Sequence, residues 1–168
     1  MLPKKIKLKK KTKSDLLKFW KKIKLKNTKP TIGFIGAGNM GLPMVKNLIK
    51  KGFHVKVYDI NSKITKKLEK DNIKSVNNLR AVANNNFIIS ILPDTQNVES
   101  VFNTDTGINS YLKPGTIVVD MSTISSSSAI EIGKKLQKEQ IEFLDAPVSG
   151  GIKGAINANL SIMVGGKK

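Results

Sequence analysis

Apolar and polar positions change their spacing repeatedly along this chain, and the changes predict alternating strands and helices. Short, nearly continuous apolar runs have the length of buried strands and occupy residues 32–35, a run ending in Asp59, 87–92, 116–120, 141–144 and 160–164. Between them, apolar residues recur at helical spacing at 40–51, 61–71, 75–83, 94–102 and 125–136. This alternation predicts an α/β fold: a Rossmann-type, doubly wound, mostly parallel sheet covered by helices on both faces.

The first strand leads directly into a glycine-rich turn. Residues 32–35 are followed by Gly36, Ala37, Gly38, Asn39, Met40 and Gly41, and then by a helical pattern that ends at Gly52. The first glycine allows a sharp turn, the second lets a pyrophosphate approach the backbone, and the third lets helix and strand pack closely. The free amides at the helix start would face the phosphates. The turn therefore predicts a dinucleotide site; the alternative is an ordinary βαβ unit without a ligand.

An acidic residue ends the second strand. Asp59 follows Gly41 by 18 residues, where a carboxylate accepts hydrogen bonds from both hydroxyls of an adenine ribose and repels a 2′-phosphate. We therefore expect NAD as the cofactor rather than NADP. Lys63 lies close enough in sequence to touch a ribose phosphate, which leaves some use of NADP open.

Composition limits the possible sites. The chain has 168 residues, enough for one domain with an appendage. It contains no cysteine, which excludes disulfides, thiolate zinc sites and cysteine nucleophiles, and we expect no metal site. Its only histidine, His54, starts a strand far from the carboxyl ends and is expected to be structural. No apolar run approaches the roughly 18 residues that span a bilayer.

Most of the net charge of +18 lies in the first 29 residues, which hold thirteen lysines and one acid. We therefore divide the chain into a basic tail, 1–29, and an NAD(P)-binding domain, 30–168. In the tail, Leu16, Leu17, Phe19, Trp20 and Ile23 would gather on one side of a helix, with lysines on the other. Three interpretations stay open: a targeting or membrane-surface helix, although it lacks Arg and has little Ser; a solvated extension; and a nucleic-acid-binding arm.

Four separated motifs carry a resemblance to a known family. They are GAGNMGLPM at 36–44, LPD at 92–94, VDMST at 119–123, and DAPVSGG at 145–151 with IMVGG at 162–166. In this order and spacing they resemble the amino-terminal, NAD(P)-binding domain of the β-hydroxyacid dehydrogenases, over residues 30–166. The resemblance implies that residues 36–41 and Asp59 hold the adenosine and pyrophosphate of NAD. It assigns the nicotinamide end to Leu92, Pro93, Asn97 and Thr123, and the substrate to Ser122, Ser149, Gly150 and Gly151.

The resemblance also implies a function, namely an NAD-dependent oxidoreductase of a small 3-hydroxy acid. The family's catalytic lysine lies beyond Lys168, in a helical carboxyl-terminal domain that is absent from this chain, so no catalytic residue is assigned and the chain alone is expected to be inactive. Ala158 stands where the family usually has glycine. Two alternatives are a nucleotide-binding module without catalysis and a chromatin-associated relative with a basic arm.

Partners and location are further expectations from the resemblance. They are a small 3-hydroxy acid substrate, a homo-oligomer in the full-length form and no membrane span, with nucleic acid the less favoured partner. A mitochondrial matrix location is favoured, with a cytoplasmic or nuclear location left open.

Overall fold

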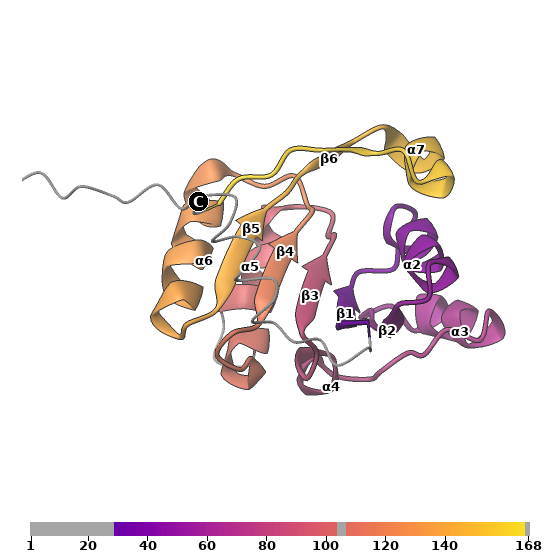
Figure 1. Ribbon diagram of the computed structural model, residues 1–168, viewed down its shortest axis with the longest axis horizontal. Coiled ribbons are helices and arrows are strands. Elements are labelled where there is room, and N and C mark those ends of the chain that lie inside the picture. The colour runs from indigo at the N-terminus through magenta and orange to yellow at the C-terminus, as the bar shows by residue number, and fades with distance from the viewer. Residues whose placement is uncertain (1–28, 104–106, 167–168) are drawn as a thin grey trace, which may run out of the picture.

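The computed structural model describes residues 29–103 and 107–166, so the amphipathic helix expected in the tail lies outside the described residues. Five parallel strands form the main sheet, in the order β2-β1-β3-β4-β5 (Figure 1). Their bounds are β1 Thr31–Ile35, β2 His54–Tyr58, β3 Phe87–Ser90, β4 Ile117–Asp120 and β5 Glu142–Asp145. The predicted Rossmann-type, doubly wound fold is confirmed.

Six α-helices and one 3-10 helix are present in the described ranges. They are α2 Gly41–Lys50, α3 Ser62–Lys70, α4 Leu79–Ala83, α5 Thr95–Asn103, η1 Ile108–Tyr111, α6 Ser126–Lys138 and α7 Gly151–Asn157. The longest is α6, with 13 residues. None of the helices in these ranges is long and apolar enough to cross a lipid bilayer.

A single bridge extends the sheet beyond β2. Ser75 pairs in parallel with Val57, whose N–H donates to the Lys74 carbonyl at 2.9 Å and whose carbonyl accepts from Val76 at 2.8 Å. With this bridge, the strand order becomes that of a dinucleotide-binding sheet with its third strand outermost. The helix predicted over residues 75–83 is therefore wrong in its first half. It begins only at Leu79, where the Asn78 side chain accepts a hydrogen bond from the Ala81 amide.

The two faces of the sheet carry separate cores. On one face, Phe34 of β1 packs with residues from α2 and α3, among them Val45 and Leu68. On the other face, Ile88 of β3 packs with residues from α5 and α6 such as Val98. The helices that follow β1 and its neighbour β3 lie on opposite faces of the sheet, so the loops that follow these two strands diverge. That divergence leaves a crevice at the carboxyl ends of the strands.

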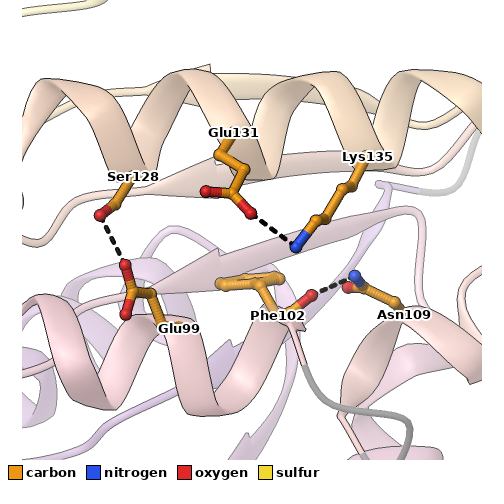
Figure 2. A network of polar contacts seen from close by, with 6 residues as sticks. All are labelled: Glu99, Phe102, Asn109, Ser128, Glu131 and Lys135. Carbon is orange, nitrogen blue, oxygen red and sulfur yellow. Dashed lines mark hydrogen bonds and ion pairs between the residues drawn. The ribbon is translucent and has the colours of Figure 1, made fainter.

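Polar contacts tie α5, α6 and η1 together over the second core (Figure 2). The Ser128 hydroxyl of α6 donates to Glu99 Oε1 of α5 at 2.6 Å, and the Asn109 side-chain amide donates to the Phe102 carbonyl. Glu131 and Lys135 form an ion pair along the exposed side of α6. The first two contacts join the helices to one another, while the buried apolar residues join them to the sheet.

The segment after β5 differs most from the sequence-based expectation. The glycine-rich loop expected there contains α7, and the expected strand at 160–164 is reduced to β7 (Ser161–Ile162). β7 pairs in antiparallel fashion with β6 (Val148–Ser149) in a separate two-stranded sheet. The segment crosses from β5 to α2 (Figure 1), where the Asn47 side-chain amide donates to the Ala155 carbonyl at 2.7 Å.

Ala158 ends α7 in a conformation that favours glycine. Its φ is 55° and its ψ is 38°, in the left-handed region where a Cβ costs roughly 1–2 kcal/mol. The greater freedom of glycine in the unfolded chain offsets part of this cost. We expect Ala158→Gly to raise the free energy of unfolding by about 0.5–1 kcal/mol in urea titrations. Ala155→Gly, at a buried helical position of α7, is the control and should lower it; a loss of stability in Ala158→Gly would contradict the prediction.

Candidate cofactor cleft

A cleft of about 590 Å³ lies at the carboxyl ends of β1, β2 and β3. Nine of the eleven residues predicted to contact the cofactor line it. They are Gly36, Gly38, Asn39, Met40, Gly41, Asp59, Leu92, Pro93 and Asn97. Of the other two, Ala37 is buried under the cleft and Thr123 is exposed outside its lining. The structure therefore brings together three sequence segments that were predicted to meet.

The three glycines of the turn have different surroundings. Gly36 has a φ of +91°, and a Cβ there would lie 2.3 Å from the Ile91 carbonyl oxygen. A Cβ on Gly41 would lie 1.9 Å from the Gly36 carbonyl oxygen, whereas one on Gly38 would have no atom within 4 Å. The fold itself requires the first and third glycines. The second leaves open space on the cleft side of the turn, as the approach of a ligand to the backbone would require.

The amino end of α2 is left without a side-chain cap. Asn61, Asn78 and Ser125 cap α3, α4 and α6, but Met40 at the start of α2 offers no such hydrogen bond, and the first turn contains no acid. The first amides of a helix have no partner within the helix and lie at the positive end of its dipole. At the cleft these amides suit an anionic group such as a pyrophosphate.

Two backbone amides hold the Asp59 carboxylate in place. Ala37 N–H donates to Oδ2 at 2.7 Å, and Asn61 N–H donates to Oδ1 at 2.8 Å. Neither of the two ion pairs in the described ranges involves Asp59. The carboxylate is thus fixed between the glycine turn and α3, with lone pairs left to accept hydrogen bonds from a ligand.

The far end of the cleft is formed by the turn between β3 and α5. The Asn97 backbone and side-chain amides donate to Asp94 at 2.8–2.9 Å, and these hydrogen bonds hold the pKa of the Asp94 carboxyl below its ordinary value. Asp94 therefore fixes Asn97 beside Pro93 in the lining.

Sequence reasoning missed the apolar side of the cleft. Ile60, Ile64 and Leu79 line it together with Ile35, Tyr58, Ile91 and Val101, and the polar residues Asn61 and Ser100 complete the set. Ile60 is 90% exposed, and with Ile64 and Leu79 it presents apolar surface to the cleft. The sequence feature that could have indicated this apolar side is Ile60, an isoleucine between the strand-ending Asp59 and the helix-capping Asn61.

A buried polar network lies beneath the far end. The hydroxyls of Ser90 and Ser122 each donate to Asp120 Oδ1 at 2.7 Å, and Leu92 N–H donates to Ser122 Oγ at 2.8 Å. Ser122, which the resemblance assigned to the substrate, is only 2% exposed. Its hydroxyl supports the Leu92 backbone, and its contact with a substrate stays a prediction.

The remaining substrate residues lie outside the cleft lining. Ser149, Gly150 and Gly151 are exposed on the segment that crosses toward α2, and Ser149 pairs with Ser161. Their role also stays a prediction. Residues 29–103 and 107–166 contain no cluster of His, Asp or Glu that could hold a metal ion.

Burial raises the pKa of Asp120 above its ordinary value of 3.8, against the lowering effect of the Ser122 and Ser90 hydrogen bonds, and Asp145 raises it further. A raised pKa in the folded state means that folding favours the protonated acid. The resulting stabilisation is complete below the ordinary pKa and is lost as pH rises through the folded-state pKa. We expect Asp120→Asn, which cannot titrate, to remove this part of the pH dependence of unfolding, measured by urea titration at a series of pH values. Parallel profiles for both proteins would contradict this.

Comparison with known families matches residues 31–168 to the NAD binding domain of 6-phosphogluconate dehydrogenase. Among curated proteins, the chain is 39% identical over 140 residues to mitochondrial 3-hydroxyisobutyrate dehydrogenase of Mus musculus, covering 83% of this chain and 42% of that protein. It is 41% identical over 135 residues to 2-(hydroxymethyl)glutarate dehydrogenase of Eubacterium barkeri, covering 80% and 45%. The chain therefore spans less than half the length of these relatives.

Among solved structures, similar chains are also matched over about half of their length. A Mycobacterium tuberculosis 3-hydroxyisobutyrate dehydrogenase with L-serine is similar at a TM-score of 0.77 and 34% identity, over 83% of this chain and 47% of that chain. The protein Psf3 in complex with NADP+ and 2-OPP is similar at a TM-score of 0.77 and 26% identity, over 82% and 49%.

Proposed function

The chain belongs to the family of the NAD binding domain of 6-phosphogluconate dehydrogenase, and from this membership we propose that it is the cofactor-binding part of an NAD-dependent 3-hydroxyisobutyrate-type dehydrogenase. The observation that carries the choice of cofactor is Asp59, held at the cleft by Ala37 and Asn61. A carboxylate in this place accepts ribose hydroxyls and repels a 2′-phosphate. Lys63, the cation that left NADP open, is absent from the cleft lining.

The cleft offers a distinct surface to each part of the proposed cofactor. The pyrophosphate would lie at the uncapped start of α2 beside Gly38, and the adenine ring would lie against the apolar side chains of Ile60, Ile64 and Leu79. The nicotinamide would lie toward Leu92. When bound, NAD supplies the acceptor for the substrate hydride, while the residues of this chain orient it and exclude water.

The proposed substrate is a small 3-hydroxy acid, with 3-hydroxyisobutyrate, an intermediate of valine breakdown, as the leading candidate. Support comes from the relatives: one bears that name, and the similar Mycobacterium tuberculosis structure contains L-serine, which also carries a hydroxyl on its third carbon. Ser122 and the exposed loop from Ser149 to Gly151 would bind its carboxylate and hydroxyl. We propose that the catalytic lysine implied by the family resemblance is not among residues 1–168, and that these residues bind cofactor without turning over substrate.

Calorimetric titration of the 168-residue chain with NADH and NADPH tests this proposal. We expect NADH to bind at least roughly tenfold more tightly than NADPH, a difference of about 1.4 kcal/mol. Equal affinities would remove the preference for NAD, and binding of neither would overturn the proposed function. Reduction of NAD with 3-hydroxyisobutyrate by this chain alone would contradict the assignment of the proton acceptor to a segment beyond Lys168.

The location of the protein is proposed from the tail and from the relatives. Residues 1–29 combine lysines with apolar residues that would share one side of a helix, and the mouse relative is named as mitochondrial. We propose that the tail directs the protein to the mitochondrial matrix. A fusion of residues 1–29 to a fluorescent protein should enter mitochondria; a diffuse or nuclear signal would favour the solvated extension or the basic arm.

A further inference from the structure

The geometry points to Asp120 as a positioning residue that sets the nicotinamide end of the cleft by holding Ser122 under the Leu92 amide; this rests on the proposed function. The first step is the placement of Asp120. It ends β4, is fully buried, and faces Ser90 of β3 in the sheet register. Because β3 and β4 are parallel neighbours that end at the same edge of the sheet, the carboxylate lies directly beneath the loop that follows β3.

The second step is the direction of the hydrogen bonds. Asp120 Oδ1 accepts from both serine hydroxyls, at 2.7 Å each. A hydroxyl that donates to a carboxylate has its lone pairs free for another donor. Ser122 Oγ donates its hydrogen to Asp120 in this way and accepts a hydrogen bond from Leu92 N–H at 2.8 Å. Asp120 therefore determines which way the Ser122 hydroxyl points, and through it where the Leu92 backbone lies.

The third step is the asymmetry within Asp120. Oδ2 is buried and has no hydrogen-bond partner among the described residues, while Oδ1 accepts from both serine hydroxyls and, at 3.4 Å, from the Ser122 N–H. An unsatisfied buried oxygen is costly, so an apolar side chain would be easier to accommodate if packing were its only role. The network instead supports one amide of the cleft lining. The adenine end depends on other contacts, namely those of Asp59 and the glycine turn.

Two variants separate positioning from general damage. Asp120→Ala removes the acceptor of both serines, and Asp120→Asn keeps an oxygen at the Oδ1 position. Ser90→Ala is the matched control, because it removes one bond to Asp120 and leaves the chain from Asp120 through Ser122 to Leu92 complete. If Asp120→Ala does not fold, Ser122→Ala breaks the same chain at the next link.

Hydrogen exchange of the Leu92 amide in the ligand-free chain is the first measurement. Asp120→Ala should speed its exchange by roughly tenfold relative to the Gly36 amide, which donates to the Tyr58 carbonyl instead. Asp120→Asn and Ser90→Ala should leave it near the wild-type rate. An unchanged Leu92 rate in both Asp120→Ala and Ser122→Ala would overturn the positioning role, whether or not the protein binds NAD.

Affinity for NADH and for ADP-ribose, which lacks the nicotinamide, is the second measurement. Asp120→Ala should weaken NADH by roughly tenfold and leave ADP-ribose within about twofold of wild type. Equal losses for both probes would show general damage to the cleft and overturn the inference. If the wild-type chain binds neither probe, the proposed function fails, and the exchange rates alone decide whether Asp120 positions Leu92.

Discussion

Gly41→Ala is expected to destabilise the domain by about 3 kcal/mol or more and to abolish measurable NADH binding. The added Cβ would lie 1.9 Å from the Gly36 carbonyl oxygen and 3.1 Å from a methyl group of Ile91. The nearest atom belongs to the backbone and cannot rotate away as a flexible side chain does. Either α2 moves away from β1 or the glycine turn opens, and both changes displace the α2 amides that face the cleft. Thermal unfolding and NADH titration measure the two effects.

Gly38→Ala is the matched control, since it adds the same methyl group three residues earlier. No atom lies within 4 Å of its Cβ position, so the free energy of unfolding should change by less than about 1 kcal/mol. NADH binding should still weaken, because the methyl group would occupy the space through which a pyrophosphate reaches the backbone. If Gly38→Ala bound NADH as tightly as wild type, the phosphates would have to lie elsewhere. Near-normal stability of Gly41→Ala would contradict the packing argument.

The sequence was most informative where one residue type had a single physical use. A run such as residues 32–35, followed at once by glycines and a helical pattern, predicts β1, the turn and α2 because few other structures accept that order. The helical patterns at 61–71 and 125–136 form α3 and α6, and the side-chain oxygens of Asn61 and Ser125 cap them by accepting hydrogen bonds from backbone amides. The strands β1 to β5 and the glycine turn are local features that local patterns predicted, whereas the strand expected at 160–164 is only the short β7.

Features that depend on tertiary contacts were not predicted. α7 has two glycines in seven residues, which is a poor helical sequence, yet it forms where Asn47 of α2 binds its carbonyls. The partnership of Ser90 with Asp120 joins residues 30 apart and exists only because β3 and β4 are neighbours in register. Ile60 forms part of an apolar surface only because the fold places Ile64 and Leu79 in the same cleft lining.

Asp59→Arg should reverse the cofactor preference. The change removes the proposed acceptor of the ribose hydroxyls, and charge-assisted hydrogen bonds of this kind contribute about 1.5–3 kcal/mol each. NADH affinity should therefore fall roughly 100-fold, while NADPH, whose 2′-phosphate can pair with a guanidinium, should be affected less or bind more tightly. Ala37 and Asn61 also lose their shared acceptor, so some stability will be lost. Titrations must therefore be made well below the unfolding temperature of the variant.

Asp71→Arg separates this local effect from a general change in charge. It makes the same change of two charges at an exposed residue outside the cleft lining, where Asp71 pairs with Lys46. If added positive charge simply attracted anionic nucleotides, both variants would bind NADH and NADPH more tightly. If Asp59 only supported the turn, Asp59→Arg would weaken both nucleotides equally. A change in the ratio of NADPH to NADH affinity in Asp59→Arg alone requires direct contact with the ribose, and its absence would remove the basis for assigning NAD to this cleft.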